Sequence, residues 1–341
     1  MIIGGLLVTI FALSWVSTGG LRRYALSKRL MDIPNERSSH TVPTPRGGGV
    51  AIVFSFLIAL PILWALGLSG IGTLFALLGS GLLVATIGFA DDHGHIAARW
   101  RLLGHFIAAI WALYWLDGLA PVAFFSATID LGWLGNALAA IYLVWMLNLY
   151  NFMDGIDGLA SAEALCVCLG GGLICLVTGQ LELLWVMLAL AGAVAGFLCW
   201  NYPPARIFMG DAGSGFLGVA LGILTLSAAK VSSTLMWSWV ILLGVFVVDA
   251  TLTLCRRVFN GDKVYQAHRS HAYQYASRQY RSHKAVTLGV VGLNLLWLLP
   301  WAIVVAVGLV PGIIGLIISY APLLWLAARF KAGTRECQPP L

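Results

Sequence analysis

Long apolar runs, separated by short polar stretches, extend through the whole chain. The runs are continuous, and most approach the ~20 residues that a helix needs to cross a bilayer. Strands of a membrane barrel would instead alternate apolar and polar positions over ~10 residues. The pattern predicts an all-α, polytopic integral membrane protein with about eleven transmembrane helices. They are expected near residues 2–20, 48–68, 71–90, 102–117, 132–150, 159–178, 182–199, 214–230, 236–254, 285–308 and 312–328.

Composition agrees with this interpretation. Of the 341 residues, 60% are hydrophobic and only 10% are charged, and the mean hydropathy is +0.90. A soluble domain carries roughly 25% charged residues. The composition therefore excludes a soluble protein, and membrane lipids, with no nucleic acid, are the expected surroundings. Residues 1–341 are expected to form a single transmembrane domain.

The basic residues predict the orientation of the chain. If the first span runs from outside to inside, every Lys and Arg except Lys230 falls on one face, and an excess of Lys and Arg marks the cytoplasmic side. We therefore expect a periplasmic N-terminus and a cytoplasmic C-terminus. The expected cytoplasmic loops lie near residues 21–47, 91–101, 151–158, 200–213 and 255–284.

Aspartates gather on the same face as the basic residues. Five of them lie at the ends of spans or in adjoining loops: Asp91, Asp92, Asp154, Asp157 and Asp211. An aspartate at the centre of a span costs about 2.5–3.5 kcal/mol. Insertion of the chain explains a basic face by itself, but it does not explain a band of carboxylates. The distribution predicts a functional site at this face.

Two aspartates stand side by side in "GFADDHGHIAARWRLLGHF", residues 88–106. Asp91 and Asp92 repel each other, and a nearby cation or Mg²⁺ is the usual way to keep both ionised. Arg101 lies close behind them in the sequence. A polar stop at a helix end is the alternative, and it explains one aspartate better than two.

A row of amide and carboxylate side chains marks "NLYNFMDGIDGLA", residues 148–160. Asn148, Asn151 and Asp154 are spaced by three, so they share one face if the helix continues, and Asp157 extends the row. Glycines follow both aspartates and allow the helix to break. Such oxygens suit a nucleobase, a ribose or the water shell of a metal.

The stretch "NYPPARIFMGDAGSGFLG", residues 201–218, combines prolines, an aspartate and glycines before an apolar run. Glycine permits close backbone approach, and the start of a helix offers free N–H groups to anions. Asp211 beside such a loop is a candidate Mg²⁺ ligand, because Mg²⁺ in phosphate chemistry takes one or two carboxylates together with phosphate oxygens. A helix N-cap at Asp211 is the alternative.

Cations accompany these groups in two further stretches. His268, Arg269 and His271 lie in the predicted loop 255–284, and Arg46 follows a proline-rich segment. These side chains could bind diphosphate oxygens. Zinc is a weaker alternative because no cysteine lies near the histidines, and a basic loop resting on anionic headgroups is another.

One chemistry accounts for the set: Mg²⁺-assisted transfer of a phosphosugar from a nucleotide diphosphate. Carboxylates would hold the metal, cations would neutralise phosphate charge, and a positioned carboxylate would deprotonate the attacking oxygen. A site at the membrane edge implies a lipid acceptor. An ion-coupled secondary transporter is the alternative, although its site would lie near the bilayer midplane.

Four stretches in order, "DIPNERSSHTVPTPRGGG", "FADDHG", "NLYNFMDGIDGLA" and "NYPPARIFMGDAGSGFLG", resemble the polyprenyl-phosphate N-acetylhexosamine-1-phosphate transferases. The resemblance covers residues ~30–285 and is greatest to enzymes that initiate O-antigen synthesis. It implies transfer of N-acetylhexosamine-1-phosphate from a UDP-N-acetylhexosamine to undecaprenyl phosphate, with release of UMP. It also implies Mg²⁺, with Mn²⁺ as a substitute, a homodimer, and a bacterial inner-membrane location with the site facing the cytoplasm.

The resemblance also implies roles for individual residues. Asp211 matches the Mg²⁺-binding aspartate, Asp91 the proposed base for the lipid phosphate, and Asp92 a position beside the metal. Asn148, Asn151, Asp154 and Asp157 match an Asn/Asp-rich motif near the metal and the nucleotide, and Asn201 matches an asparagine of the pocket. Asp92, Asp154 and Asp157 are catalytic candidates together with Asp91, and Asp92 is also a candidate metal ligand. The residues expected to contact substrate are Asn148, Asn151, Asn201, Arg46 and Arg101. The family usually carries consecutive histidines in the last loop, where this chain has "HRSHAYQ". Arg269 and His271, a catalytic candidate, align with that motif, and His268 is expected to contact substrate.

Overall fold

The computed structural model describes residues 2–34, 39–40, 42–94, 96–125, 127–262 and 268–334. Its first eight helices form the main bundle: α1 (Ile2–Lys28), α2 (Val50–Ala65), α3 (Ile71–His93), α4 (Ala98–Trp115), α5 (Gly132–Met153), α6 (Leu159–Thr178), α7 (Leu181–Asn201) and α8 (Asp211–Val231). The remaining helices are α9 (Ser233–Leu242), α10 (Gly244–Phe259), α11 (Ala272–Tyr280), α12 (His283–Leu293), the π-helix η1 (Asn294–Leu298), α13 (Leu299–Ala306) and α14 (Gly312–Arg329).

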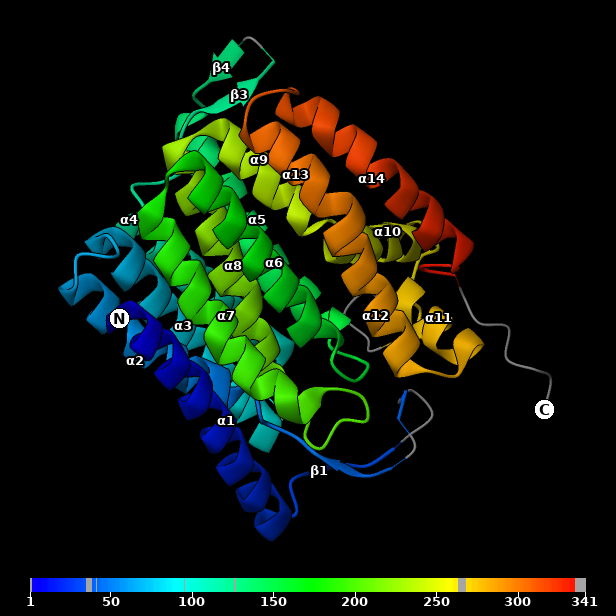
Figure 1. The fold of residues 1–341 in the computed structure, drawn as a ribbon. Coiled ribbons are helices and arrows are strands. Elements are labelled where there is room, and N and C mark those ends of the chain that lie inside the picture. Colours follow the sequence, from blue (N-terminus) through cyan, green and yellow to red (C-terminus); the bar gives the residue numbers. More distant parts are fainter. Residues whose placement is uncertain are drawn as a thin grey trace.

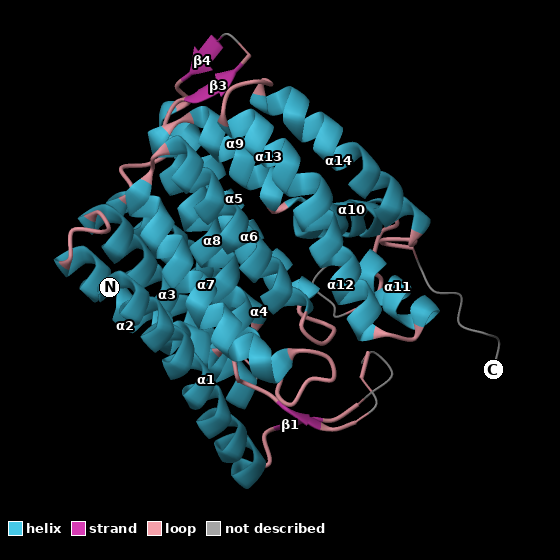
Figure 2. Ribbon diagram, viewed as in Figure 1, coloured by secondary structure: helices cyan, strands magenta, loops and turns pink. Residues whose placement is uncertain are grey.

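Two short antiparallel strand pairs stand at opposite ends of the bundle (Figures 1 and 2). Strand β1 (Met31–Asp32) pairs with β2 (Thr44–Pro45). Strand β3 (Val122–Phe124) pairs with β4 (Ala127–Ile129). We call the end that carries β1 and β2 the site end.

The helices confirm the prediction of an all-α polytopic membrane protein. In the described part of the chain, eight helices are long and apolar enough to cross a membrane. The expected span 236–254 is instead the pair α9 and α10, which bends by 71°. Helices α2 and α4 also form, but α2 has only 16 residues and α4 begins with a charged turn, so neither is among the eight. The number of eleven spans and the orientation stay predictions.

Helix α8 lies at the centre of the bundle, with every residue of its apolar stretch buried. Glycines allow it to touch its neighbours through the backbone. A Cβ on Gly218 would lie 2.4 Å from the Met146 carbonyl of α5, and one on Gly88 of α3 would lie 2.5 Å from the Ala212 nitrogen. The second contact brings the end of α3 against the first turn of α8, and so brings Asp92 to Asp211.

Replacing Gly218 with alanine should destabilise the protein, because the new methyl group would overlap backbone atoms of α5. Overpacking of this kind costs about 1–3 kcal/mol, and we expect a lower midpoint of thermal unfolding in detergent. Gly289→Ala is the matched control, since nothing lies within 4 Å of a Cβ at that position in α12. Equal midpoints for the two variants would contradict the close α5–α8 contact.

Candidate active site

A polar cavity of about 220 Å³ lies at the site end of the bundle. Its walls come from segments far apart in the sequence: the β1 segment, the end of α3, the α5–α6 turn, the α7–α8 loop, α11 and α12. The lining residues are Asp32, Ser39, His40, Arg46, Asp92, Asn151, Asp154, Gly155, Ile156, Asp157, Asn201, Phe208, Gly210, Asp211, Ser214, Gln274 and His283. Four of the five aspartates expected to cluster therefore share one cavity.

Asp92 holds the start of α8. Its two carboxylate oxygens accept hydrogen bonds from the Asp211 N–H at 3.3 Å and the Ala212 N–H at 3.4 Å. The N-cap residue itself is Gly210, with φ +80° and no capping side chain. The alternative that Asp211 is the N-cap is therefore wrong: Asp92 of α3 binds these N–H groups, and the Asp211 side chain is left for the cavity.

Asp91 points to a different space from its neighbour. It forms an ion pair with Arg101 and accepts a hydrogen bond from the Ile96 N–H at 2.8 Å. Arg101 Nη1 also lies 3.6 Å from Asp211 Oδ2. Asp91 and Arg101 line a second, smaller cavity of about 60 Å³, which shares Asn151 and Asp211 with the first. The two adjacent aspartates thus serve two connected spaces.

The asparagines of the α5 end lie beside these cavities. Asn148 lines the smaller cavity and donates from Nδ2 to the Val144 carbonyl at 2.7 Å. Asn151 lines both cavities. The expected row of Asn148 and Asn151 is therefore present, but α5 ends at Met153, so Asp154 and Asp157 leave the helix.

Asn201 joins the two glycine-containing loops of the site. Its Oδ1 accepts hydrogen bonds from the Gly158 N–H at 3.1 Å and the Ser161 hydroxyl at 2.7 Å. Its Nδ2 donates to the Ile207 carbonyl at 3.0 Å. The side chain lines the cavity, but its polar atoms bind the protein's own backbone and side chains. The geometry makes Asn201 a support of the loops.

Asp157 is held in its ionised form. Its Oδ2 accepts a hydrogen bond from the Ala205 N–H at 3.0 Å, and its Oδ1 lies 3.2 Å from Nδ1 of His283. Burial raises the pKa of Asp157, but the hydrogen bonds from His283 and Ala205 outweigh it, so the pKa lies below its usual range. The sequence had not singled out His283.

Asp154 has the opposite environment. Among the residues that the structure describes, no donor or cation contacts its carboxylate. Burial, and then repulsion from the carboxylates of Asp211 and Asp92, raises the pKa of Asp154 well above its usual value. The carboxylates of Asp92, Asp154 and Asp211 therefore face one cavity, and the arginine in its lining is Arg46. One arginine does not balance three carboxylates.

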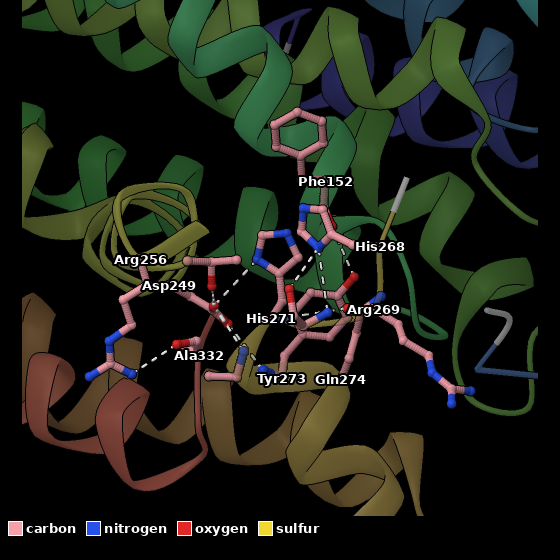
Figure 3. Close-up of polar contacts among 12 residues, drawn as sticks. Phe152, Asp249, Arg256, His268, Arg269, His271, Tyr273, Gln274 and Ala332 are labelled. Atoms are coloured by element: carbon pink, nitrogen blue, oxygen red, sulfur yellow. Dashed lines mark hydrogen bonds and ion pairs between the residues drawn. The ribbon is translucent and has the colours of Figure 1, made fainter. Parts of the chain in front are cut away.

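His268 and His271, the two histidines predicted to act at the site, do not line this cavity. His271 is buried, with Nδ1 3.4 Å from Oδ1 of Asp249, and its ring stacks near those of Phe152 and His268 (Figure 3). Burial, followed by repulsion from His271 and Arg257, lowers the pKa of His268 to about 3. His268 and Arg269 line a separate cavity of about 150 Å³. Their expected role at a diphosphate stays a prediction.

The same segment reaches the cavity through a residue that the sequence did not reveal. The Asp249 carboxylate of α10 accepts hydrogen bonds from the Ala272 N–H at 2.9 Å and the Tyr273 N–H at 3.0 Å (Figure 3). The Tyr273 hydroxyl donates to the Phe152 carbonyl at 2.9 Å. These contacts dock α11 on the end of α5 and place Gln274 in the cavity wall.

Comparison with known proteins places the chain in a family. The model of glycosyl transferase family 4 matches residues 74–229, which contain the five clustered aspartates. The chain is 29% identical over 274 residues to the probable undecaprenyl-phosphate N-acetylglucosaminyl 1-phosphate transferase of Bacillus subtilis, covering 79% of this chain and 75% of the relative.

Two further relatives carry related names. The chain is 30% identical over 241 residues to the phospho-N-acetylmuramoyl-pentapeptide-transferase of Streptococcus thermophilus, covering 67% of this chain and 69% of the relative. It is 28% identical over 315 residues to the decaprenyl-phosphate N-acetylglucosaminephosphotransferase of Mycobacterium tuberculosis, covering 82% and 77%. The chain belongs to glycosyl transferase family 4, within its polyprenyl-phosphate N-acetylhexosamine-1-phosphate transferases.

Proposed function

We propose that this protein transfers N-acetylhexosamine-1-phosphate from a UDP-N-acetylhexosamine to undecaprenyl phosphate, giving the lipid diphosphate sugar and UMP. The observation that carries the proposal is the cavity in which Asp92, Asp154 and Asp211 converge. The relatives are named as transferases of sugar phosphates to polyprenyl phosphates or of the muramoyl pentapeptide phosphate, which supports the same reaction class. The initiating step of O-antigen synthesis is the role we propose for it.

The carboxylate cluster fits a bound Mg²⁺. Within the described residues, no three His, Cys, Asp or Glu side chains enclose a metal by themselves. A phosphate-bound Mg²⁺ needs only one or two carboxylates, since waters and phosphate oxygens complete its octahedron. The Asp154 carboxylate has no partner and lies beside two other acids, as expected where a cation binds. We propose Asp211 and Asp92 as the residues that hold Mg²⁺, with Mn²⁺ as a substitute.

When bound, the metal would screen the charge of the transferring phosphate. The protein's own residues would do the rest. Asp91, in the smaller cavity, would accept the proton of the attacking lipid phosphate, and Arg101 would orient it through the ion pair described above. Arg46, which lines the larger cavity, would bind donor phosphate oxygens.

The two connected cavities favour direct attack. Asn151 and Asp211 belong to both spaces, so a donor in one and an acceptor in the other would meet at the same carboxylate. Holding both reactants in place supplies much of the rate enhancement in such a transfer. No covalent intermediate on the protein is needed in this arrangement.

We further propose the inner membrane of a bacterium as the location, with the site end in the cytoplasm, and a homodimer as the assembly. The basic residues support the orientation, because all of them except Lys230 belong to loops expected on one side. The nucleotide sugar would then reach the cavity from the cytoplasm.

The reaction is tested with purified protein, undecaprenyl phosphate, Mg²⁺ and a panel of UDP-N-acetylhexosamines, following UMP release. Asp154→Asn should lower the rate by roughly 10²–10³-fold, the usual cost of removing one electrostatic contact to the transition state. In the absence of Mg²⁺ its midpoint of thermal unfolding should rise, because burial and the neighbouring carboxylates of Asp92 and Asp211 make a carboxyl group at this position unfavourable in the folded protein, and asparagine removes that cost.

Asp117→Asn is the matched control, since Asp117 is an exposed aspartate that pairs with Lys230 far from the cavity. It should keep the wild-type rate. Absence of UMP with every donor, from folded protein containing both lipid and metal, would refute the proposed reaction.

The orientation is tested by cysteine labelling. In a variant lacking the six native cysteines, Phe125→Cys in the β3–β4 turn should react with a membrane-impermeant maleimide added to intact spheroplasts. Thr334→Cys, at the end of the described chain, should react only after permeabilisation. The reverse pattern would invert the proposed topology.

A further inference from the structure

A polar pair lies inside the bundle, between α6 and the α12–η1 helix. Glu163 and Asn294 are both buried, with exposed fractions of 0% and 2%. Nδ2 of Asn294 donates to Oε2 of Glu163 at 2.5 Å, and also to the Val290 carbonyl at 3.1 Å. An ionisable side chain in a membrane helix is rare and usually has a function.

Two hydrogen-bond acceptors of this pair have no donor. Glu163 Oε1 and Asn294 Oδ1 are both buried and have no donor. No Lys, Arg or His in the described ranges forms an ion pair with Glu163. Leaving a buried polar atom without a partner is costly, and an ionised carboxylate is only an acceptor.

One proton would satisfy both oxygens. A carboxylic acid and a primary amide are complementary, because each offers one donor and one acceptor on the same edge. With a proton on Oε1, Glu163 would donate to Asn294 Oδ1 while Asn294 Nδ2 donates to Glu163 Oε2. The reciprocal pair needs no counter-ion and suits a buried position in a membrane helix.

The pair also belongs to a row of polar contacts that reaches the active-site cavity. His283 Nδ1 lies 3.2 Å from Asp157 Oδ1, and the Thr287 hydroxyl donates to the Asp157 carbonyl at 2.9 Å. His283, Thr287 and Asn294 follow at intervals of four and seven residues, so they share one face of the helix. Asp157 lies two residues before the start of α6, and Glu163 lies one turn into it.

The π-helix η1 begins at Asn294. Turns of this type often mark functional positions in helices. The irregular turn and the polar pair therefore coincide at the point where the row of contacts ends. Fixing Asn294 against α6 fixes the register of α12, and with it the position of His283.

We propose that Glu163 is a neutral acid paired reciprocally with Asn294, and that this pair positions α12 so that His283 holds Asp157 in the active-site cavity. Glu163 and Asn294 are thus positioning residues that act through His283. Glu163 lies about two helical turns beyond Asp157, and Asn294 about three helical turns beyond His283. The catalytic part of this inference rests on the proposed function; the protonation and packing of the pair do not.

Infrared spectroscopy of the purified full-length protein tests the pair directly. The difference spectrum of wild type minus Glu163→Gln should contain the carbonyl band of a protonated carboxylic acid. Glu182→Gln, at an exposed glutamate in the first turn of α7, should remove no such band. Absence of the acid band from the first difference spectrum would mean an ionised Glu163 and would overturn the proposal.

Two variants test the positioning role. Glu163→Gln reproduces both hydrogen bonds with an amide and should keep UMP release within about twofold and the unfolding midpoint near that of wild type. Glu163→Leu removes the contact of Asn294 with α6 and leaves its bond to the Val290 carbonyl. It should lower kcat about tenfold or more, as does loss of groups that orient a site residue. Equal losses in the two variants, or wild-type kcat in Glu163→Leu, would contradict the role.

The readouts separate this inference from the proposed reaction. If wild type releases no UMP, the infrared band and the unfolding midpoints of Glu163→Gln and Glu163→Leu still report on the pair. A band lost in Glu163→Gln, with a midpoint lowered only in Glu163→Leu, would support the pair although the reaction had failed.

Discussion

The site depends on one contact, the binding of the first N–H groups of α8 by the carboxylate of Asp92 from α3. The first N–H groups of a helix have no partner within it, and a carboxylate there also interacts favourably with the helix dipole. Gly88 lets α3 approach the α8 backbone closely. The contact therefore holds the end of α3, and the loop that follows it, against the start of α8 and the α7–α8 loop. The geometry of Asp91, Asp211 and both cavities follows from it.

The aspartates around this contact have different environments. Asp157 receives hydrogen bonds and stays ionised, Asp91 receives an arginine, and Asp154 receives neither. A lysine or arginine side chain beside Asp154 would have neutralised its carboxylate. Its isolation beside two other acids is unfavourable for the protein alone, and strain of this kind is tolerated where function needs it. The absence of a partner for Asp154 among the described residues supports the proposed cation better than the number of aspartates does.

Much of this arrangement could be predicted from the sequence, because apolar runs and helix-end residues are local signals. The runs predicted α5, α6, α7 and α8 within a few residues, and the aspartates and asparagines predicted one shared site. The residues that were missed act across the fold: His283, Gln274 and Asp249 reach the site, or support it, from helices late in the chain. The local pattern around His283 does not record its contact with Asp157, which lies 126 residues earlier in the chain. The contacts of Asp249 with Ala272 and Tyr273 likewise join two separate helices. The 71° bend between α9 and α10 was missed for a related reason, since the apolar run continues through it.

Asp92 both binds the first N–H groups of α8 and lines the cavity, and this affects how variants of the protein are to be interpreted. A side chain that both caps a helix and faces the cavity links folding to chemistry, so substitutions there change abundance and turnover together, and neither measurement alone identifies the cause. Asp154 has no hydrogen-bond or ion-pair partner among the described residues, so a loss of activity there cannot be attributed to a lost structural contact. In a mutational scan of this family, we therefore expect substitutions at the position of Asp154 to give folded but inactive protein. Substitutions at the position of Asp92 should lower the amount of folded protein as well.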